Sequence, residues 1–256
     1  KAIITFHEVW WKLWFRLPFL YIPSRLIFWI YEQCIIRLPF HKFIAVSDFT
    51  KQALLHYIDE NKVIKIYNGL DYSKLPIKQD YEQPSVYKFI YFGRIGVSKG
   101  LDLIIKSFGK ILKKYHNVQL TLVIPQVPVY FYWQILKLLK KNAILDKVTL
   151  LHNLSREALQ SEVLNSYSVL SPSYSEGFCY SIVEAIGMGV PVISSGKGAL
   201  KEVVCGKFIE MKSQTVQGLT DAVEEAISGK WIETPVKKFE LSEQIQEYIK
   251  LYKTLI

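Results

Sequence analysis

From residue 87 onward, short apolar runs alternate with segments in which apolar residues recur every three to four positions. Residues 88–92 form the first run, and residues 101–115 then gather their apolar side chains on one helical face. The same alternation predicts strands at residues 119–124, 148–151, 168–170, 190–194 and 207–210, and helices at 129–142, 155–165, 180–188 and 215–228. Repeated strand–helix units predict an α/β fold in which helices cover both faces of a parallel sheet.

The first 75 residues show a shorter version of this pattern. Strands are predicted at residues 2–6, 42–46 and 63–67, and helices at 24–38 and 48–57. The proline-containing, mixed-charge stretch 74–84 indicates a linker, and residues 241–256 form a final amphipathic helix. Because the chain opens directly on a strand without an initiator Met, we expect it to start inside a larger protein.

Composition narrows the protein class. Half of the residues are apolar and 21% are charged, which excludes intrinsic disorder and collagen-like repeats. The three cysteines, Cys34, Cys179 and Cys205, form no CxxC pair, so a zinc ribbon and a disulfide framework are excluded and a reducing compartment is expected. The most apolar window, residues 13–36, is interrupted by prolines and arginines and is not a membrane span.

Charge is distributed unevenly along the chain. Residues 1–150 carry 22 Lys and Arg against 10 Asp and Glu, whereas residues 151–256 carry 10 against 13. The basic first part therefore favours an anionic partner, such as a membrane surface, a nucleic acid or a phosphorylated ligand.

Two loops at predicted strand ends carry candidate chemistry, because ligands of open parallel sheets bind at the carboxyl ends of the strands. Residues 93–100 bring Arg94, Lys99 and three glycines to a helix N-terminus, which suits a phosphate group. Neither the Walker A pattern nor GxGxxG is present. A solvated turn before a basic helix is the alternative interpretation.

The second loop, residues 171–179, places Glu176 just before a predicted helix and Glu184 inside it. Eight helical residues rise about 12 Å, whereas the carboxylates of glycosidases lie about 5–9.5 Å apart. The spacing argues against a hydrolytic pair and suits two carboxylates that bind hydroxyls of two sugars, as in a nucleotide sugar. The N–H groups of Gly177, Phe178 and Cys179 would then hold the diphosphate. Alternatively, Glu176 is a first-turn anion and Glu184 a surface residue.

These runs resemble a known family. Residues 173–185, SYSEGFCYSIVEA, continue as IGMGVPVI and resemble the E-x7-E motif of family-4 retaining glycosyltransferases with the GT-B fold. Residues 92–100, FGRIGVSKG, are similar to that family's phosphate-binding Arg/Lys loop, and residues 45–47, 67–71 and 248–255 match further segments in the same order.

The resemblance implies a GT-B architecture of two facing Rossmann-like domains with parallel sheets, of which the first is incomplete. Residues 1–75 would be the C-terminal part of the acceptor-side domain and residues 76–86 a linker. Residues 87–238 would bind the nucleotide-sugar donor, and residues 239–256 would form a helix that packs back toward the first domain.

The resemblance also assigns roles to donor-binding residues. Gly93, Arg94 and Lys99 would bind the diphosphate and stabilise it as the glycosidic bond breaks. Glu184 would accept hydrogen bonds from the ribose, and Leu154, after strand 148–151, would lie beside the nucleobase.

Two residues are assigned to the reacting sugar by the same resemblance. Glu176 would contact the transferred sugar, and His7, at the end of the first strand, would line the cleft near it. A structural histidine is the alternative for His7. Such enzymes retain the anomeric configuration through a front-face attack guided by the leaving phosphate, and no metal or cofactor is expected besides the nucleotide sugar.

Three departures from the family pattern stand out. Cys179 occupies a position where Gly or Ser is commoner, and we interpret it as a small filler residue rather than a reactive thiol. Residues 125–126 are Pro-Gln where the family often has a glycine-rich turn, which puts the donor contact there in doubt. The opening strands of the first domain are absent, so this fragment is not necessarily active alone.

Residues 10–42 mix ten aromatic residues with five Lys and Arg and a single acidic residue, Glu32. This composition favours peripheral contact with an anionic membrane surface. A buried helix pair in the first domain is the alternative, and no nucleic-acid-binding signature accompanies the segment.

The sequence therefore predicts a glycosyltransferase that moves a sugar from a nucleoside-diphosphate sugar to a lipid-linked or polysaccharide acceptor. We expect it in the cytoplasm, with peripheral attachment to the inner face of the plasma membrane. A non-catalytic nucleotide-sugar-binding protein and a nucleotide-sugar epimerase of similar fold remain alternatives.

Overall fold

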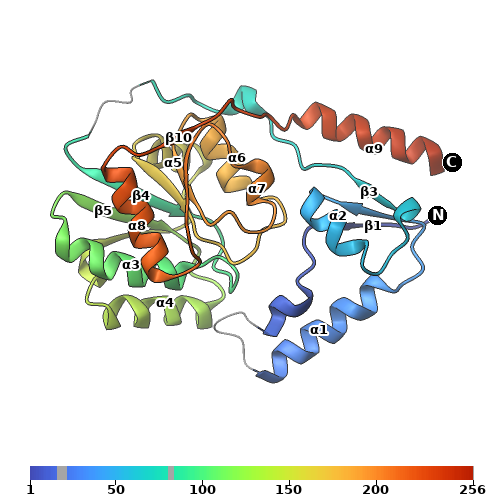
Figure 1. Ribbon diagram of the computed structural model, residues 1–256, viewed down its shortest axis with the longest axis horizontal. Helices are drawn as coiled ribbons and strands as arrows, with labels where there is room; N and C mark the ends of the chain where they lie inside the picture. Colours follow the sequence, from blue (N-terminus) through green and yellow to red (C-terminus); the bar gives the residue numbers. More distant parts are fainter. Residues whose placement is uncertain (16–21, 80–83, 256) are drawn as a thin grey trace.

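The computed structural model describes residues 1–15, 22–79 and 84–255. Within these ranges the strands form a three-stranded sheet, in the order β1-β2-β3, and a seven-stranded sheet, in the order β10-β9-β8-β7-β4-β5-β6. The described strand pairs are parallel except for β10 with β9. The predicted α/β fold with parallel sheets is confirmed, and the two sheets lie in separate parts of the molecule (Figure 1).

The strands are β1 (Ile3–Phe6), β2 (Lys42–Ala45), β3 (Val63–Lys65), β4 (Tyr87–Phe92), β5 (Val118–Val123), β6 (Val148–Leu151), β7 (Ser168–Ser171), β8 (Val192–Ser194), β9 (Lys207–Glu210) and β10 (Ile232–Glu233). The α-helices are α1 (Ile22–Ile36), α2 (Asp48–Leu54), α3 (Leu101–Lys114), α4 (Val129–Lys141), α5 (Arg156–Leu164), α6 (Tyr180–Gly187), α7 (Leu200–Val203), α8 (Val216–Ile227) and α9 (Leu241–Leu255). Short 3₁₀ turns are η1 (Trp11–Phe15), η2 (Glu60–Lys62), η3 (Tyr72–Lys74) and η4 (Leu145–Lys147). Elements α7 and β10 were not predicted, because four and two residues are too short to show a periodicity.

The larger sheet has Rossmann-like topology. From β4, the chain moves outward through β5 and β6 on one side and then returns to place β7, β8 and β9 on the other side. The strand order reverses between β4 and β7, and open α/β sheets bind their ligands at such a reversal. The loops that follow β4 and β7 are the two loops that the sequence singled out.

Both faces of this sheet are buried, which explains the nearly continuous apolar runs of its strands. On β4, Phe89 and Tyr91 pack in a core with side chains of α3, α4 and α8. Ile90 and Phe92 face the opposite way and pack with side chains of α5, α6 and α7. The alternation along β4 thus fixes which helices cover each face.

The smaller sheet is covered in part by the C-terminal helix. Leu251 of α9 packs in one apolar cluster with Ile44 of β2 and Ile66, which follows β3. The hydroxyls of Tyr248 and Thr5 lie 3.2 Å apart. Helix α9, at the C-terminal end of the chain, therefore packs against the sheet formed near the N-terminus (Figure 1).

One carboxylate links the two parts of the molecule. Glu202 of α7 accepts hydrogen bonds from the backbone N–H groups of Asp48 (2.8 Å) and Phe49 (2.6 Å), at the start of α2. The Tyr67 hydroxyl donates to the same carboxylate over 3.0 Å. A side chain beside the larger sheet thus satisfies helix-terminal N–H groups beside the smaller one.

Candidate functional site

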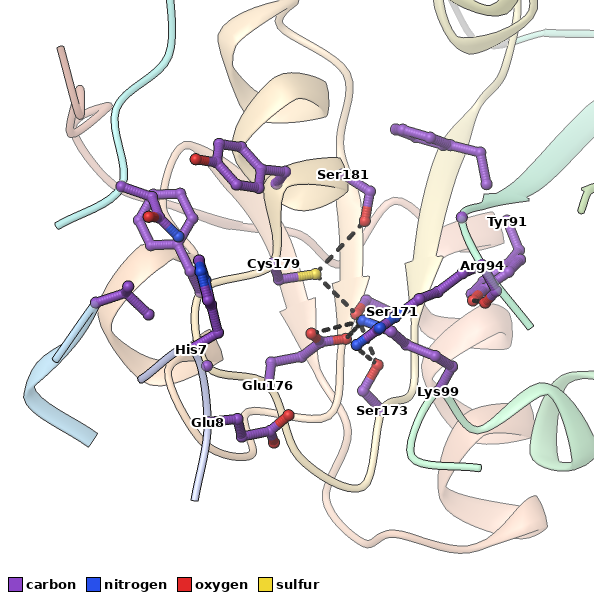
Figure 2. Close-up of a pocket in the computed structure, with 17 residues that line it drawn as sticks. His7, Glu8, Tyr91, Arg94, Lys99, Ser171, Ser173, Glu176, Cys179 and Ser181 are labelled. Carbon is purple, nitrogen blue, oxygen red and sulfur yellow. Dashed lines mark hydrogen bonds and ion pairs between the residues drawn. The ribbon is translucent and has the colours of Figure 1, made fainter. Parts of the chain in front are cut away.

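A cleft of about 480 Å³ opens where the carboxyl ends of strands from both sheets meet (Figure 2). Its lining comes from the last residues of β4 and β7, from the segments that follow β1, β2, β3, β4 and β7, and from the start of α6. The lining residues are His7, Glu8, Val46, Asn68, Tyr91, Phe92, Gly93, Arg94, Lys99, Ser171, Ser173, Glu176, Gly177, Phe178, Cys179, Tyr180 and Ser181. The cleft therefore lies at the point where the strand order of the larger sheet reverses.

Two glycines allow the cleft walls to approach each other. Gly100, which precedes α3, has a φ of 69°, and a Cβ there would lie 2.2 Å from the carbonyl oxygen of Pro172. A Cβ on Gly177 would lie 1.5 Å from the carbonyl oxygen of His7. Glycine is therefore required where the β4 and β7 loops touch and where the smaller sheet meets the β7 loop.

A buried ion pair joins the two loops. The Lys99 Nζ lies 2.8 Å and 2.7 Å from the two carboxylate oxygens of Glu176, and the Ser173 hydroxyl donates to Glu176 over 2.7 Å. Burial is the largest single influence on the pKa of Lys99 and lowers it, but the raising effects, chiefly the charge of Glu176 and the hydrogen bonds to it, together exceed burial and raise that pKa. Lys99 therefore stays protonated and holds the loop after β4 to the loop after β7.

Arg94 is in a different environment from Lys99. Its side chain is exposed to solvent, while its backbone carbonyl accepts a 2.9 Å hydrogen bond from the hydroxyl of the buried Tyr91. Burial, reinforced by the nearby charge of Glu176, raises the pKa of Tyr91 well above its usual range, so this hydroxyl remains a donor. Tyr91 thereby fixes the loop backbone and leaves the guanidinium at the cleft available to an anion.

The start of α6 completes this wall. Phe178 is buried and packs edge-on against Phe239, with ring centroids 5.2 Å apart. Cys179 has a φ of 71°, a conformation that glycine adopts more readily, which accounts for glycine being common at this position in the family but not for the cysteine found here. Burial raises the pKa of the Cys179 thiol to about 11, so the thiol is protonated at neutral pH, as expected of a filler residue.

The structure brings most of the predicted site residues together but not all of them. His7 is exposed and lines the cleft. Glu184 instead lines a neighbouring cavity of about 40 Å³ with Arg156, and Phe92 borders both spaces. Burial raises the pKa of Glu184, and Arg156 opposes this effect. Leu154 does not line either of these two cavities in the described chain.

Several cleft residues were not predicted. Glu8 follows His7 directly, and Ser173 lies three positions before Glu176, yet neither the strand end nor the loop marks them as special. An acidic residue beside a candidate site histidine was the available signal for Glu8. Asn68, in the turn after β3, reaches the cleft only because the smaller sheet lies opposite the larger one.

Metal-binding clusters and membrane-spanning helices are both absent from the described residues. Among them, no group of three or more His, Cys, Asp or Glu side chains is arranged to hold a metal ion. None of the helices described is both long and apolar enough to cross a bilayer.

Sequence comparison identifies relatives. The family profile described as Glycosyl transferases group 1 matches residues 76–252. A phosphatidylinositol N-acetylglucosaminyltransferase subunit of Arabidopsis thaliana is 23% identical over 187 residues, covering 72% of this chain and 41% of that protein. The O-antigen chain mannosyltransferase RfbU of Salmonella typhimurium is 25% identical over 209 residues, which cover 78% of this chain and 54% of that protein. The chain thus spans about half the length of these relatives.

Solved structures show the same fold. Sucrose-phosphate synthase from Thermosynechococcus elongatus superimposes with a TM-score of 0.75 at 18% identity, covering 99% of this chain and 67% of that one. Anabaena HepE, solved in complex with UDP and glucose, gives a TM-score of 0.71 at 16% identity, with 98% and 71% covered. These neighbours are glycosyltransferases of the GT-B fold, and because the family profile matches well over half of the sequence, the chain belongs to the glycosyl transferases group 1 family.

Proposed function

We propose that this chain belongs to a retaining family-4 glycosyltransferase that moves a sugar from a nucleoside-diphosphate sugar to an acceptor. The observation that carries the proposal is the meeting of Arg94, Lys99 and Glu176 in one cleft, at the start of α6. Residues 87–238 would bind the donor, residues 1–75 would face the acceptor, residues 76–86 would link the two, and α9 would tie the second part to the first.

On this proposal, Lys99 and Glu176 exchange each other for new partners when the donor binds. Lys99 and Glu176 neutralise each other in the free protein. A diphosphate offers Lys99 a more highly charged partner, and Arg94 and the N–H groups of Gly177, Phe178 and Cys179 supply further donors. Glu176, released from Lys99, then accepts hydrogen bonds from hydroxyls of the transferred sugar. Ribose hydroxyls would reach Glu184, past Phe92, and the nucleobase would extend toward Leu154.

The transfer step follows from these positions. The bond between the anomeric carbon and the diphosphate oxygen breaks, and its electron pair leaves with the nucleoside diphosphate, whose charge Arg94 and Lys99 stabilise. The acceptor hydroxyl attacks the same face, and its proton passes to an oxygen of the departing diphosphate, so configuration is retained. His7 lies at the end of β1 on the opposite wall and would contact the transferred sugar. The proposal assigns the leaving-group charge to these two cations and needs no metal ion.

Calorimetry of the full-length protein with UDP, GDP and ADP tests the donor site. Arg94→Ala should weaken binding of the preferred nucleoside diphosphate at least about tenfold, because a charge-assisted hydrogen bond is lost. Lys113→Ala, which removes an exposed lysine on α3 outside the cleft, is the matched control and should bind normally. Unchanged affinity in both Arg94→Ala and Lys99→Ala would refute the phosphate assignment.

For the acceptor, we propose a lipid-linked molecule or a polysaccharide. The name of the Arabidopsis relative includes phosphatidylinositol, which is a lipid, and the name of the Salmonella relative includes O-antigen chain, which is a polysaccharide. The exposed apolar side chains of the first part support a lipid-proximal acceptor, since large exposed apolar surfaces mark interaction sites.

We also propose peripheral attachment to a cytoplasmic membrane face through residues 10–42. Apolar side chains exposed on η1, on α1 and just after α1 are Trp11, Phe15, Leu26, Ile27, Phe28, Ile30, Tyr31 and Leu38. Trp14 and Trp29 are half-buried, and the Lys12 ammonium lies 4.8 Å from the Trp11 ring centroid. The alternative interpretation, a buried helix pair, does not fit the exposure of these apolar side chains. Arg16, Phe19 and Tyr21, also part of the predicted segment, lie outside the described residues.

Flotation of the full-length protein with vesicles tests the attachment. Phosphatidylglycerol-containing vesicles should hold it at low salt and release part of it at high salt, because each Lys or Arg at an anionic surface contributes about 1 kcal/mol that salt screens. Ile27→Ser with Tyr31→Ser, 64% and 65% exposed on α1, should reduce flotation. Ile245→Ser with Ile249→Ser, a comparably spaced exposed pair on α9, should not. Equal flotation of the two double variants would contradict the proposal.

A further inference from the structure

Helix α4 exposes an apolar surface on the larger part of the molecule, away from the cleft residues. Val129, Tyr130 and Trp133, in the first half of the helix, are 57%, 67% and 57% exposed, and Val127, just before the helix, is 63% exposed. Residues three and four positions apart are neighbours on a helix surface, so the three helical side chains are contiguous. Contiguous exposed patches of large apolar side chains mark interaction sites.

The second half of the same helix face is basic. Lys137, Lys140 and Lys141 are exposed, and at 3.6 residues per turn they fall within the same third of the helix circumference as the apolar patch. Helix α4 contains no acidic residue. None of the three lysines forms an ion pair with a residue that the structure describes. The exposed stripe therefore changes from apolar and aromatic to cationic along its length.

The opposite face of α4 fixes the direction of this stripe. Ile135 and Leu139 are buried in the core that α3 and α4 form with one face of the larger sheet. The exposed stripe therefore points away from that sheet. Figure 1 shows α4 along the lower edge of the larger part and α1 along the lower edge of the smaller part.

The start of α4 also lies beside the loop after β4. Phe131 and Gln134 border a small apolar recess together with Ile95 and Val97, which follow Arg94 in that loop. A partner that contacts the exposed face of α4 is therefore held close to the loop that bears Arg94.

We propose that α4 is a second membrane-contacting surface, carried by the donor-binding part, and that its partner is an anionic lipid bilayer. The inference deepens the proposed membrane attachment and rests on it. The rings of Tyr130 and Trp133 suit the headgroup level of a bilayer, where one end of the side chain is apolar and the other is wet. The lysines complement anionic headgroups. With 13 residues, α4 is about 20 Å long and would lie in the plane of the interface.

A bilayer accounts for two exposed surfaces with one partner. Helices α1 and α4 belong to parts built on separate sheets, and both expose large apolar side chains. A lipid surface is extended, so it can contact both helices at once. Docking through both parts would hold the cleft at the bilayer, where a lipid-linked acceptor can enter it without leaving the membrane.

The test measures partitioning of the full-length protein into phosphatidylglycerol-containing vesicles by flotation over a range of lipid concentrations. Tyr130→Ser with Trp133→Ser should lower the partition coefficient at least about tenfold, because two rings no longer leave water. Ile249→Ser with Tyr252→Ser is the matched control, since these α9 side chains are also three positions apart and are 47% and 49% exposed. The control should partition within twofold of wild type.

Two further measurements examine the charge and the depth of the contact. Lys137→Gln with Lys141→Gln should lower the partition coefficient about tenfold at low salt, and the difference from wild type should shrink at high salt. Lipids brominated on their acyl chains quench inserted tryptophans. Trp133→Phe should reduce the quenched fraction of the fluorescence, whereas Trp231→Phe, which removes a ring packed against the core of the larger sheet, should not.

The melting temperature and the affinity for UDP or GDP should match wild type in both double variants, because the four side chains are exposed and lie outside the cleft. If the aromatic variant melts lower, the lysine variant decides. Normal flotation of the α4 variants, together with reduced flotation of Ile27→Ser with Tyr31→Ser, overturns this inference alone.

Ultracentrifugation without lipid tests a second copy of the chain as the partner. A wild-type dimer that Tyr130→Ser with Trp133→Ser converts to a monomer, with flotation unchanged, also overturns the inference. If wild-type protein does not float with anionic vesicles, the proposed attachment fails and this inference fails with it.

Discussion

Glu176 and Glu8 are two carboxyls in one cleft with opposite surroundings. Glu176 contacts the Lys99 ammonium through both oxygens and receives the Ser173 hydroxyl. The Oε1 atom of Glu8 is also buried, yet it lacks a partner among the residues that the structure describes. Both side chains line the same space, so the difference between them lies in their partners.

The contrast concerns how each carboxyl is held in the free protein. A paired carboxylate is stable in the free protein but must surrender a partner before it can bind anything else. A buried carboxyl oxygen without a hydrogen-bond partner weakens the free fold. Substitutions at the two positions should therefore act in opposite directions on stability.

The largest effect should follow Lys99→Ala. It leaves Glu176 buried without its counterion, and breaking a buried pair in this way costs roughly 3–5 kcal/mol of unfolding free energy. Urea denaturation measures the loss. Adding Glu176→Gln to Lys99→Ala should recover part of it, because the unpaired charge is gone; strictly additive losses would contradict the pair.

Glu176→Gln should slow sugar transfer about a hundredfold, near 2.7 kcal/mol, because its proposed partner is the moving sugar. Binding of the free nucleoside diphosphate should change little. Glu184→Gln is the matched comparison and should mainly weaken nucleotide binding, since its proposed partner is the ribose. Steady-state rates and calorimetry on both variants measure this division. Normal binding and normal transfer in both would refute these roles.

Two serines two positions apart sharpen the contrast. Ser173→Ala removes a hydroxyl that donates to a buried carboxylate and should cost roughly 1.5–3 kcal/mol of stability. Ser175→Ala removes a buried hydroxyl that has no partner within the described ranges and should be neutral or slightly stabilising. Thermal unfolding of the pair provides the measurement, and equal losses would contradict the assigned environments.

The smallest effect is a pH dependence. Because the pKa of Glu8 in the folded protein lies above its ordinary value of 4.5, the folded state binds the proton more tightly than the unfolded state. Stability from this group is complete below about pH 4.5 and is lost as pH rises through the folded pKa. The stability gain of Glu8→Gln over wild type should therefore grow between pH 4 and pH 7 in urea titrations. The pKa of Glu184 is also raised, but Glu184 is present in both the wild type and Glu8→Gln, so its contribution cancels in the difference between their stabilities.

Most of the fold was predictable because its signals are local. Apolar periodicity located the helices and strands of the larger sheet to within about two residues. The side chain of Ser155 accepts a hydrogen bond from the Ala158 N–H and caps α5. The ends near proline and in tight turns were less accurate: β8 starts after Pro191, and α2 stops at Leu54 where residues 55–58 continue as turns.

The partners within the site were not predictable, because they depend on distant segments. Lys99 and Glu176 were each singled out, but their direct contact joins loops 77 positions apart. The surroundings of Glu8 depend on where Trp10 and Ser175 come to lie, and no spacing encodes that. The position of Glu184 beside a second cavity likewise reflects the packing of α5 against α6.

The Glu202 carboxylate has a consequence for movement between the two sheets. A rotation that opens the cleft must pull this carboxylate away from the N–H groups of Asp48 and Phe49 and from the Tyr67 hydroxyl. Water then has to replace these charge-assisted bonds, each contributing roughly 1.5–3 kcal/mol. A rotation of this kind is thus opposed by a contact outside the cleft, and raising the ionic strength should weaken that opposition.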